Sequence, residues 1–276
     1  RDLLRRHGIR PLKRLGQSFL SDPNVTRKIV EVSGLRHDDC VVEIGAGLGL
    51  MTARMARKAG WVVAVEIDRA LIPVLREELK PYPNVEIVHG DVLKFDFHSL
   101  WESRGRVNIK VVGNIPYNLS SPILFRLLEA RRCISSMVLM FQREVAERLV
   151  AGPGSKVYGI LSVLVRLYTE PAVVLKVPPQ CFYPRPRVES AVVRMVVPKR
   201  PPADVDDDTF LRAVVRAAFS KRRKTLLNNL KASSLFETRR ETLPVILEDL
   251  GIDLTSRAET LSPEDFVRLS SALRRS

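Results

Sequence analysis

The chain has 276 residues, of which 45% are hydrophobic and 28% charged, which is normal for a globular protein with one sizeable core and a smaller domain. Its formal net charge of +14 favours a polyanionic partner over a small neutral substrate. No apolar run approaches the roughly 18 residues of a membrane-spanning helix, so nucleic acid is a better candidate than a membrane.

The cysteines and histidines are scattered. Cys40, Cys133 and Cys181 are far apart and form no C-x-x-C pair, which predicts reduced thiols in a reducing compartment. The four histidines have no ligand spacing, so we expect no metal site. No signal peptide is visible, and we expect a cytoplasmic protein.

The N-terminal residues 1–14 carry six cations against one acid. This pattern indicates an arm that contacts phosphates, the alternative being a solvated terminus. Asp22-Pro23 is a helix start, and apolar residues then recur every three or four positions as far as Val32.

A glycine-rich turn follows the first predicted strand, 40–44. The segment Gly45–Gly49 lets a backbone approach a ligand closely, and the helix after it adds favourable partial charge. The next strand, 61–65, ends at Glu66, about 20 residues beyond the first glycine, where an acid reaches ribose hydroxyls. The G-x-G-x-G spacing, with Glu43 inside the strand, favours S-adenosylmethionine over NAD.

Polar residues end two further predicted strands. Asp91 comes soon after the strand 85–88. Its carboxylate could accept a hydrogen bond from an adenine amino group, or the residue could simply form a turn. Val111 and Val112 run into Gly-Asn-Ile-Pro-Tyr, which places Asn114 and Tyr117 at the ligand-binding edge of an open sheet. An Asn oxygen can accept a hydrogen bond from an exocyclic amino group and a ring can stack on a base, although these are also ordinary turn residues.

The remaining sequence predicts further strands and helices of the same domain, followed by a helical segment. Helices are expected to begin at 121 and at 142, and residues 156–168 show apolar periodicity. Strands are expected at 136–141, 171–177 and 191–197. The apolar side chains of 136–141 are expected to lie in the core. Residues 198–208 have the composition of a linker. The residues from 210 onward predict short helices, with a basic run at 221–224 that favours RNA contact over a merely solvated face.

Several motifs together resemble the ribosomal RNA adenine N6-dimethyltransferases, in particular the KsgA type, which acts on 16S rRNA. The resemblance covers nearly the whole chain, and its most specific parts are the Asn-Ile-Pro-Tyr-Asn and Phe-x-Pro-x-Pro-x-Val-x-Ser motifs. The matching segments are 16–20, 43–49, Glu66, 90–91, 114–118 and 182–190.

The resemblance implies a role for each matching residue. Residues 17–20 would close over the cofactor, the glycine turn would hold its amino-acid end, Glu66 its ribose, and residues 91–92 its adenine. Asn114 would contact both the methyl donor and the target amino group. The implied cofactor-binding residues are Gln17, Ser18, Leu20, Glu43, Gly45, Gly47, Glu66, Asp91, Val92 and Asn114. The family usually has Asn at the position of Ser18, whose hydroxyl reaches less far.

The implied chemistry agrees with the residues. The N6 lone pair of adenine is delocalised into the ring, so acceptors such as the Asn114 oxygen and a carbonyl near residue 115 or 116 are needed to draw the amino group out of plane. No His or Lys adjoins the motif, and catalysis would rest on positioning and on stabilisation of developing charge. Tyr117 and Phe182 would hold the flipped adenine between their rings.

The expected fold is α/β: a Rossmann-like methyltransferase domain over 1–200 with a basic N-terminal arm, and a helical RNA-binding domain over 201–276. By resemblance the strand order is 3-2-1-4-5-7-6, with the seventh strand antiparallel. The expected RNA-binding residues are Arg5, Arg6, Lys13, Arg14, Arg185, Arg187, Lys221, Arg222, Arg223 and Lys224.

The expected reaction moves methyl groups from S-adenosylmethionine to N6 of two adjacent adenines in a 16S rRNA hairpin, by a monomer acting on a small ribosomal subunit or its precursor. An Erm-type 23S rRNA methylase or a DNA adenine methylase would use the same pocket, and a noncatalytic RNA-binding relative would keep the fold. An NAD dehydrogenase is a more distant alternative.

Overall fold

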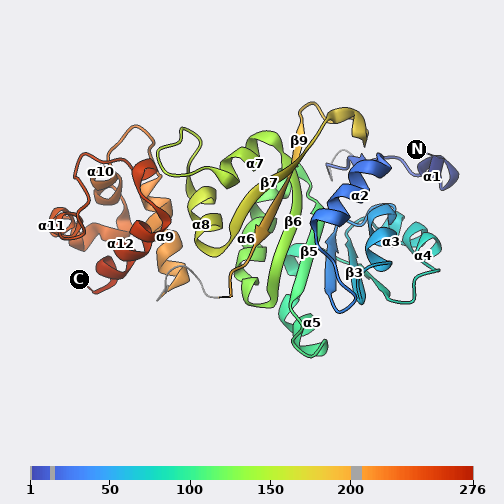
Figure 1. The fold of residues 1–276 in the computed structure, drawn as a ribbon. Coiled ribbons are helices and arrows are strands. Elements are labelled where there is room, and N and C mark those ends of the chain that lie inside the picture. Colours follow the sequence, from blue (N-terminus) through green and yellow to red (C-terminus); the bar gives the residue numbers. More distant parts are fainter. Residues whose placement is uncertain (1, 13–15, 200–206, 276) are drawn as a thin grey trace. The chain divides into compact units, whose positions relative to one another are not determined.

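The computed structural model describes residues 2–12, 16–199 and 207–275 (Figure 1). The chain divides into two compact units, Arg1–Ala146 with Glu170–Val197, and Glu147–Thr169 with Pro198–Ser276. The second unit therefore includes a segment of the expected first domain, because helix α8 (Ile160–Tyr168) packs against helices α9 and α12. The domain boundary expected between residues 200 and 201 lies outside the described residues and stays a prediction.

The first unit contains a seven-stranded sheet with the order β4-β3-β2-β5-β6-β9-β7. The five strands from β4 to β6 are parallel, whereas β9 runs antiparallel to both of its neighbours. This order and direction confirm the expected sheet. The strands are β2 (Cys40–Ile44), β3 (Trp61–Glu66), β4 (Val85–His89), β5 (Ile109–Asn114), β6 (Ile134–Gln142), β7 (Glu170–Val177) and β9 (Ser190–Val196).

The central strands are rich in β-branched residues and are buried on both faces, as parallel strands covered by helices must be. On one face, Val41, Val112 and Val192 join apolar residues of helices α2 and α3 in one core cluster. Asp22 caps helix α2 by accepting hydrogen bonds from two backbone N–H groups, as its position before proline predicts. The helices of this unit are α1 (Asp2–Arg6), α2 (Pro23–Val32), α3 (Leu50–Ala56), α4 (Ile72–Glu78), α5 (Phe97–Ser103) and α6 (Ser120–Glu129), and α7 (Arg143–Val150) leads into the second unit. Short 3-10 turns lie at 69–71, 92–94, 117–119, 131–133 and 179–181.

The N-terminal region has structure that the sequence pattern did not predict. Leu4 of α1 is buried in a cluster with Leu48, Leu71 and Val74, so the basic arm is partly a docked helix. Strand β1 (Phe19–Leu20) pairs antiparallel with β8 (Phe182–Tyr183) in a separate two-stranded sheet. These pairings fasten the N-terminal segment to the first unit.

The second unit is helical in its described residues, as expected. Its core includes Leu211, Leu226, Phe236 and Phe266, each fully buried. The basic run 221–224 lies in the turn between α9 and α10. Besides α8, the elements are α9 (Asp208–Ala218), α10 (Leu226–Lys231), α11 (Leu243–Asp249) and α12 (Pro263–Arg275), with 3-10 turns at 234–239 and 258–260.

Two further expectations concern single residue types. All three cysteines are buried free thiols, and Met137, Met140 and Phe141 are buried in the core. Among the described residues, no helix has the length and apolarity that crossing a membrane requires.

Candidate active site

The candidate site lies at the carboxyl ends of the parallel strands β2, β3 and β5. The glycine turn leaves β2, Glu66 ends β3 and Asn114 ends β5, and because these strands are neighbours their ends meet at one edge of the sheet. A cavity there holds about 910 Å³ of empty space, its open mouth included.

The glycine turn presents bare backbone to the cavity. Gly45 and Gly47 have φ angles of 70° and 58°, in the left-handed region that favours glycine. A Cβ atom on Gly47 would lie 3.2 Å from the ring of Phe19, so a side chain there would also crowd the segment that covers the turn. The predicted role of these glycines, close approach to a ligand, matches this geometry.

Glu66 holds the turn in place. Its carboxylate accepts hydrogen bonds from the backbone N–H of Gly47 at 2.8 Å and of Asp68 at 2.9 Å. Burial raises the pKa of Glu66, and the two backbone donors oppose that rise. Glu66 therefore organises the backbone of the site in addition to lining the cavity.

Glu43 lies inside β2 and also lines the cavity. Burial raises its pKa to about 8, and a hydrogen bond from the Thr52 hydroxyl counteracts part of that rise. A carboxyl group with this pKa carries a proton for most of the time at pH 7.

The side-chain amide of Asn114 is oriented by the N-terminal segment. Its Nδ2 donates to the backbone oxygen of Ser18 at 2.8 Å, and the residue lines the cavity. Because the amide nitrogen is engaged, the Oδ1 atom is the acceptor that remains for a ligand. This is the polarity that a target amino group requires.

Tyr117 lies three residues further on and lines the same cavity. Its hydroxyl forms a hydrogen bond of 2.6 Å with the hydroxyl of Ser190, at the start of β9. Burial raises the pKa of Tyr117, although the Ser190 contact opposes the rise, so the phenol stays protonated at neutral pH.

The segment 16–20 covers the cavity, and Gln17, Ser18 and Leu20 all line it. Gln17 is held at both ends of its amide, since Nε2 donates to Asp68 at 2.6 Å and Oε1 accepts from the backbone N–H of Leu12 at 2.7 Å. The Ser18 hydroxyl donates to the carbonyl of Pro184 at 2.8 Å. The Ser18 side chain thus joins two chain segments, and it is the Ser18 backbone oxygen that contacts Asn114.

Three predicted site residues are not brought into this cavity. Phe182 is 1% exposed and belongs to the core cluster beneath β1, so in this structure its ring does not face Tyr117 across an open space. Asp91 accepts a hydrogen bond from the backbone N–H of Leu93 and caps a 3-10 turn, the alternative that its sequence context left open. Neither Asp91 nor the buried Val92 lines the cavity.

Sequence reasoning did not single out four residues that act in the site. Asp68 holds Gln17, Thr52 holds Glu43, Ser190 holds Tyr117, and Phe19 packs over Gly47. Ser190 is the last residue of the motif at 182–190, but the motif does not show that it contacts Tyr117. Asp68 follows the strand of Glu66 closely, and that position is the one signal that pointed to it.

The predicted RNA-binding residues come from both units of the chain. Arg5, Arg6, Arg185, Arg187 and the run 221–224 are exposed, whereas Lys13 and Arg14 lie outside the described residues. Two of the exposed arginines have protein partners. Arg6 lies 3.8 Å from Glu78, and Arg222 contacts the backbone oxygen of Lys156 and lies 3.8 Å from Glu259.

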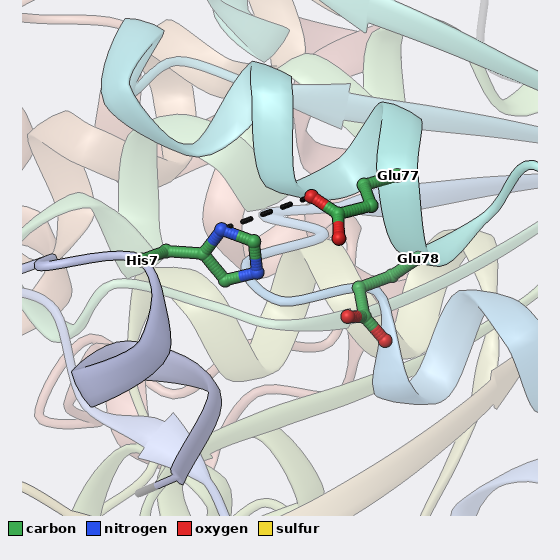
Figure 2. A group of neighbouring side chains, drawn as sticks. All are labelled: His7, Glu77 and Glu78. Atoms are coloured by element: carbon green, nitrogen blue, oxygen red, sulfur yellow. Dashed lines mark ion pairs between the residues drawn. The ribbon is translucent and has the colours of Figure 1, made fainter.

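A separate group of metal-ligand type occurs among the described residues, formed by His7, Glu77 and Glu78 (Figure 2). It joins the segment after α1 to the end of α4. The Nδ1 atom of His7 lies 3.9 Å from a Glu77 oxygen, and Glu78 is engaged by Arg6. None of the three lines the cavity. These contacts connect the N-terminal segment to α4, and because His7 lies far from Glu77 and Glu78 in the sequence, no ligand spacing marks the group.

Comparisons with known proteins agree with this geometry. The model of the family described as ribosomal RNA adenine dimethylase matches residues 10–275. A protein of Syntrophus aciditrophicus (strain SB) named ribosomal RNA small subunit methyltransferase A is 49% identical over 99% of this chain and 98% of its own length. A protein of the same name from Geobacillus sp. (strain WCH70) is 45% identical over 99% of this chain and 95% of its length.

Solved structures of other proteins are also similar to this chain. A dimethyladenosine transferase from Plasmodium falciparum has a TM-score of 0.79 at 27% identity and covers 91% of this chain and 95% of its own. The 23S rRNA methyltransferase ErmE has a TM-score of 0.71 at 28% identity, and the match covers 93% of this chain and 99% of the ErmE chain. Since the family model and relatives well above 40% identity span nearly the whole sequence, this chain belongs to the ribosomal RNA adenine dimethylase family.

Proposed function

We propose that this chain transfers methyl groups from S-adenosylmethionine to N6 of adenine in small-subunit ribosomal RNA and makes N6,N6-dimethyladenosine. As a member of its family it is an rRNA adenine dimethyltransferase that depends on S-adenosylmethionine. Relatives named for the small subunit, at 43–49% identity, favour that rRNA over the large-subunit substrate named for ErmE.

The observation that carries this proposal is the hydrogen bond from Asn114 to the Ser18 backbone. It fixes the side chain so that Oδ1 is available as an acceptor beside Tyr117 in the cavity. A hydrogen bond from the target amino group to this oxygen would draw its lone pair out of conjugation with the ring. The Tyr117 ring would supply a stacking surface for the extruded base.

The residues present fit the methyl donor. The bare backbone at Gly45 and Gly47 leaves room for its amino-acid end, and the cavity also contains Glu66, an acceptor for ribose hydroxyls. Gln17 and Leu20 would cover it. When bound, the sulfonium supplies an activated methyl group, so this chain's own task is to hold the amino nitrogen in line and exclude water. The methylated nitrogen is cationic and sheds its proton readily, so no strong base is required.

Two parts of the predicted site enter the proposal in a changed form. Asp91 and Val92 would reach an adenine moiety only beyond the present cavity, at the end of β4 next to Glu66. Phe182 would support β1 and Tyr183 from below, since its ring is buried. The exposed cations, above all those at 221–224, would contact the RNA backbone.

The finer substrate follows from the resemblance. We propose two adjacent adenines in a 16S rRNA hairpin, presented by a small subunit or its precursor in the cytoplasm, and a monomeric enzyme. Incubation with labelled S-adenosylmethionine and, separately, unmethylated small-subunit particles, 23S rRNA and duplex adenine-containing DNA tests this. Label should enter N6 of adenine in the small-subunit particles. Label in 23S rRNA or DNA alone, or RNA binding with no transfer to any substrate, would overturn the proposal.

A further inference from the structure

The hydroxyl of Ser190 is buried against the phenol of Tyr117. Ser190 is 1% exposed and its Oγ lies 2.6 Å from the Tyr117 oxygen. Because Ser190 is screened from water, leaving its hydroxyl without a partner would be costly, and the half-buried Tyr117 supplies that partner. The contact therefore restricts the ring of Tyr117.

The Tyr117 ring is held at both of its ends. Its backbone follows the stiff residue Pro116 in a 3-10 turn, and the Ser120 hydroxyl donates to its carbonyl at 3.1 Å. The Ser190 contact fixes the far end. With the backbone and the phenol oxygen both fixed, the two side-chain torsions of tyrosine have little freedom left, and the plane of the ring is set before any ligand arrives.

Ser190 is also the residue at which the neighbouring segment rejoins the sheet. As the first residue of β9, it pairs with Val177, the last residue of β7, and with Gln142 of β6. The segment 178–189 leaves the sheet after Val177 and returns to it at Ser190, which pairs with Val177. This segment contains β8, which pairs with β1 over the cavity. Ser190 thus links the rigid sheet, the covering segments and the ring.

We propose that Ser190 is a positioning residue for methyl transfer, whose hydroxyl holds the Tyr117 ring in the orientation that receives the target base. This inference rests on the proposed function. The two parts of the Tyr117 side chain then have different roles. The face of the ring stacks on the base, and the phenol oxygen only anchors the ring. A preorganised ring avoids an ordering cost each time a base is extruded, so the anchor acts on the rate of transfer.

The test compares three variants on unmethylated small-subunit particles with labelled S-adenosylmethionine. Ser190→Ala and Tyr117→Phe each break the same bond and leave the ring in place. Each should lower kcat about threefold to tenfold, as expected for one neutral hydrogen bond, with little change in KM for the particle. The double variant should lose no more than either single variant, because both remove one interaction. Tyr117→Ala, which removes the ring, should lose far more.

The matched control is Ser33→Ala. Ser33 is another buried serine of the same unit, and its hydroxyl donates to the Ile29 carbonyl at 2.7 Å, away from the cavity lining. Thermal melting should show comparable destabilisation in Ser33→Ala and Ser190→Ala, with a loss of kcat only in the latter. Multiplying losses in the double variant, or an equal loss of kcat in Ser33→Ala, would overturn the inference.

The two proposals fail in distinguishable ways. An active wild type together with an unimpaired Ser190→Ala variant overturns only the role of Ser190. A wild-type chain that transfers no methyl group to any RNA overturns the proposed function and this inference with it. If Ser190→Ala does not fold, Tyr117→Phe alone decides, because full activity in that variant would mean that the anchor has no effect on transfer.

Discussion

The amide nitrogen of Gln17 donates to a carboxylate oxygen of Asp68 at 2.6 Å, across 51 residues of sequence. Asp68 is buried and also accepts from the backbone N–H of Ala70, while its own N–H is held by Glu66. One connected network therefore joins the covering segment to the glycine turn. We therefore expect cofactor affinity to depend on Asp68, although this residue is not in the cavity lining.

Gln17→Ala should weaken S-adenosylmethionine binding about tenfold, because a hydrogen bond to a carboxylate contributes roughly 1.5–3 kcal/mol and part of this one is exposed to solvent. Asp68→Ala should weaken it at least as much. Isothermal titration measures both. Gln180→Ala removes an exposed glutamine and is the control. Unchanged affinity in both variants would show that the covering segment closes without this bond.

Gly47→Ala should abolish detectable cofactor binding while the protein stays folded. A side chain there meets an unfavourable φ of 58° and places Cβ 3.2 Å from the Phe19 ring, so the turn or the covering segment must move. Gly152→Ala is the matched control, since its added Cβ meets nothing within 4 Å and its φ is not in the left-handed region. Titration with S-adenosylhomocysteine measures the effect, and normal affinity in Gly47→Ala would contradict it.

The parts of the site that the sequence predicts well are local. The strand, glycine turn and helix at 40–56 follow one another directly, and Glu66 and Asn114 end the two strands that flank β2, in an order that the family resemblance supplied. Periodicity carries this information because each element depends on its own side chains.

What the sequence did not predict depends on long-range pairing. The strands β1 and β8 have two residues each, too few for any pattern, and lie more than 160 positions apart. The contact of Tyr117 with Ser190 spans 73 residues. The motif around Phe182 predicted a ring in the site, but a motif does not show whether a ring faces a cavity or the core, and here the ring is in the core.

Asn114→Ala should lower kcat about 10²–10³-fold, the loss typical for removal of one preorganised group that stabilises a transition state. The variant also loses the bond to the Ser18 carbonyl, so cofactor binding should weaken modestly. Asn114→Asp separates the two effects, because it keeps an acceptor and loses the donor. Single-turnover methylation of small-subunit particles measures the rate, and an unchanged rate in Asn114→Ala would overturn the catalytic assignment.

The basic run 221–224 should contribute unequally to RNA binding. Lys221, Arg223 and Lys224 are exposed, so replacing each by alanine should weaken binding to the particle and leave the stability of the protein normal. Each replacement should also reduce the slope of log K against log salt concentration by about one unit. Arg222 also contacts the Lys156 carbonyl and Glu259, so Arg222→Ala should lower the melting temperature as well. Lys58→Ala, an exposed lysine of the first unit, is the control. An unchanged salt slope in all three lysine and arginine variants would contradict RNA contact by this turn.

Glu43 should make the protein less stable as the pH rises. Burial raises its folded-state pKa from 4.5 to about 8, so the folded state holds a proton that the unfolded state releases between these values. The free energy of unfolding therefore falls as pH increases from about 5 to 8, and Glu43→Gln, which is neutral throughout, should remove that part of the decline. Urea unfolding at pH 5 and pH 8 measures it. Glu241→Gln, an exposed control, should leave the pH dependence as in the wild type. A stabilisation by Glu43→Gln that is equal at both pH values would show that Glu43 is ionised in the folded protein across this range.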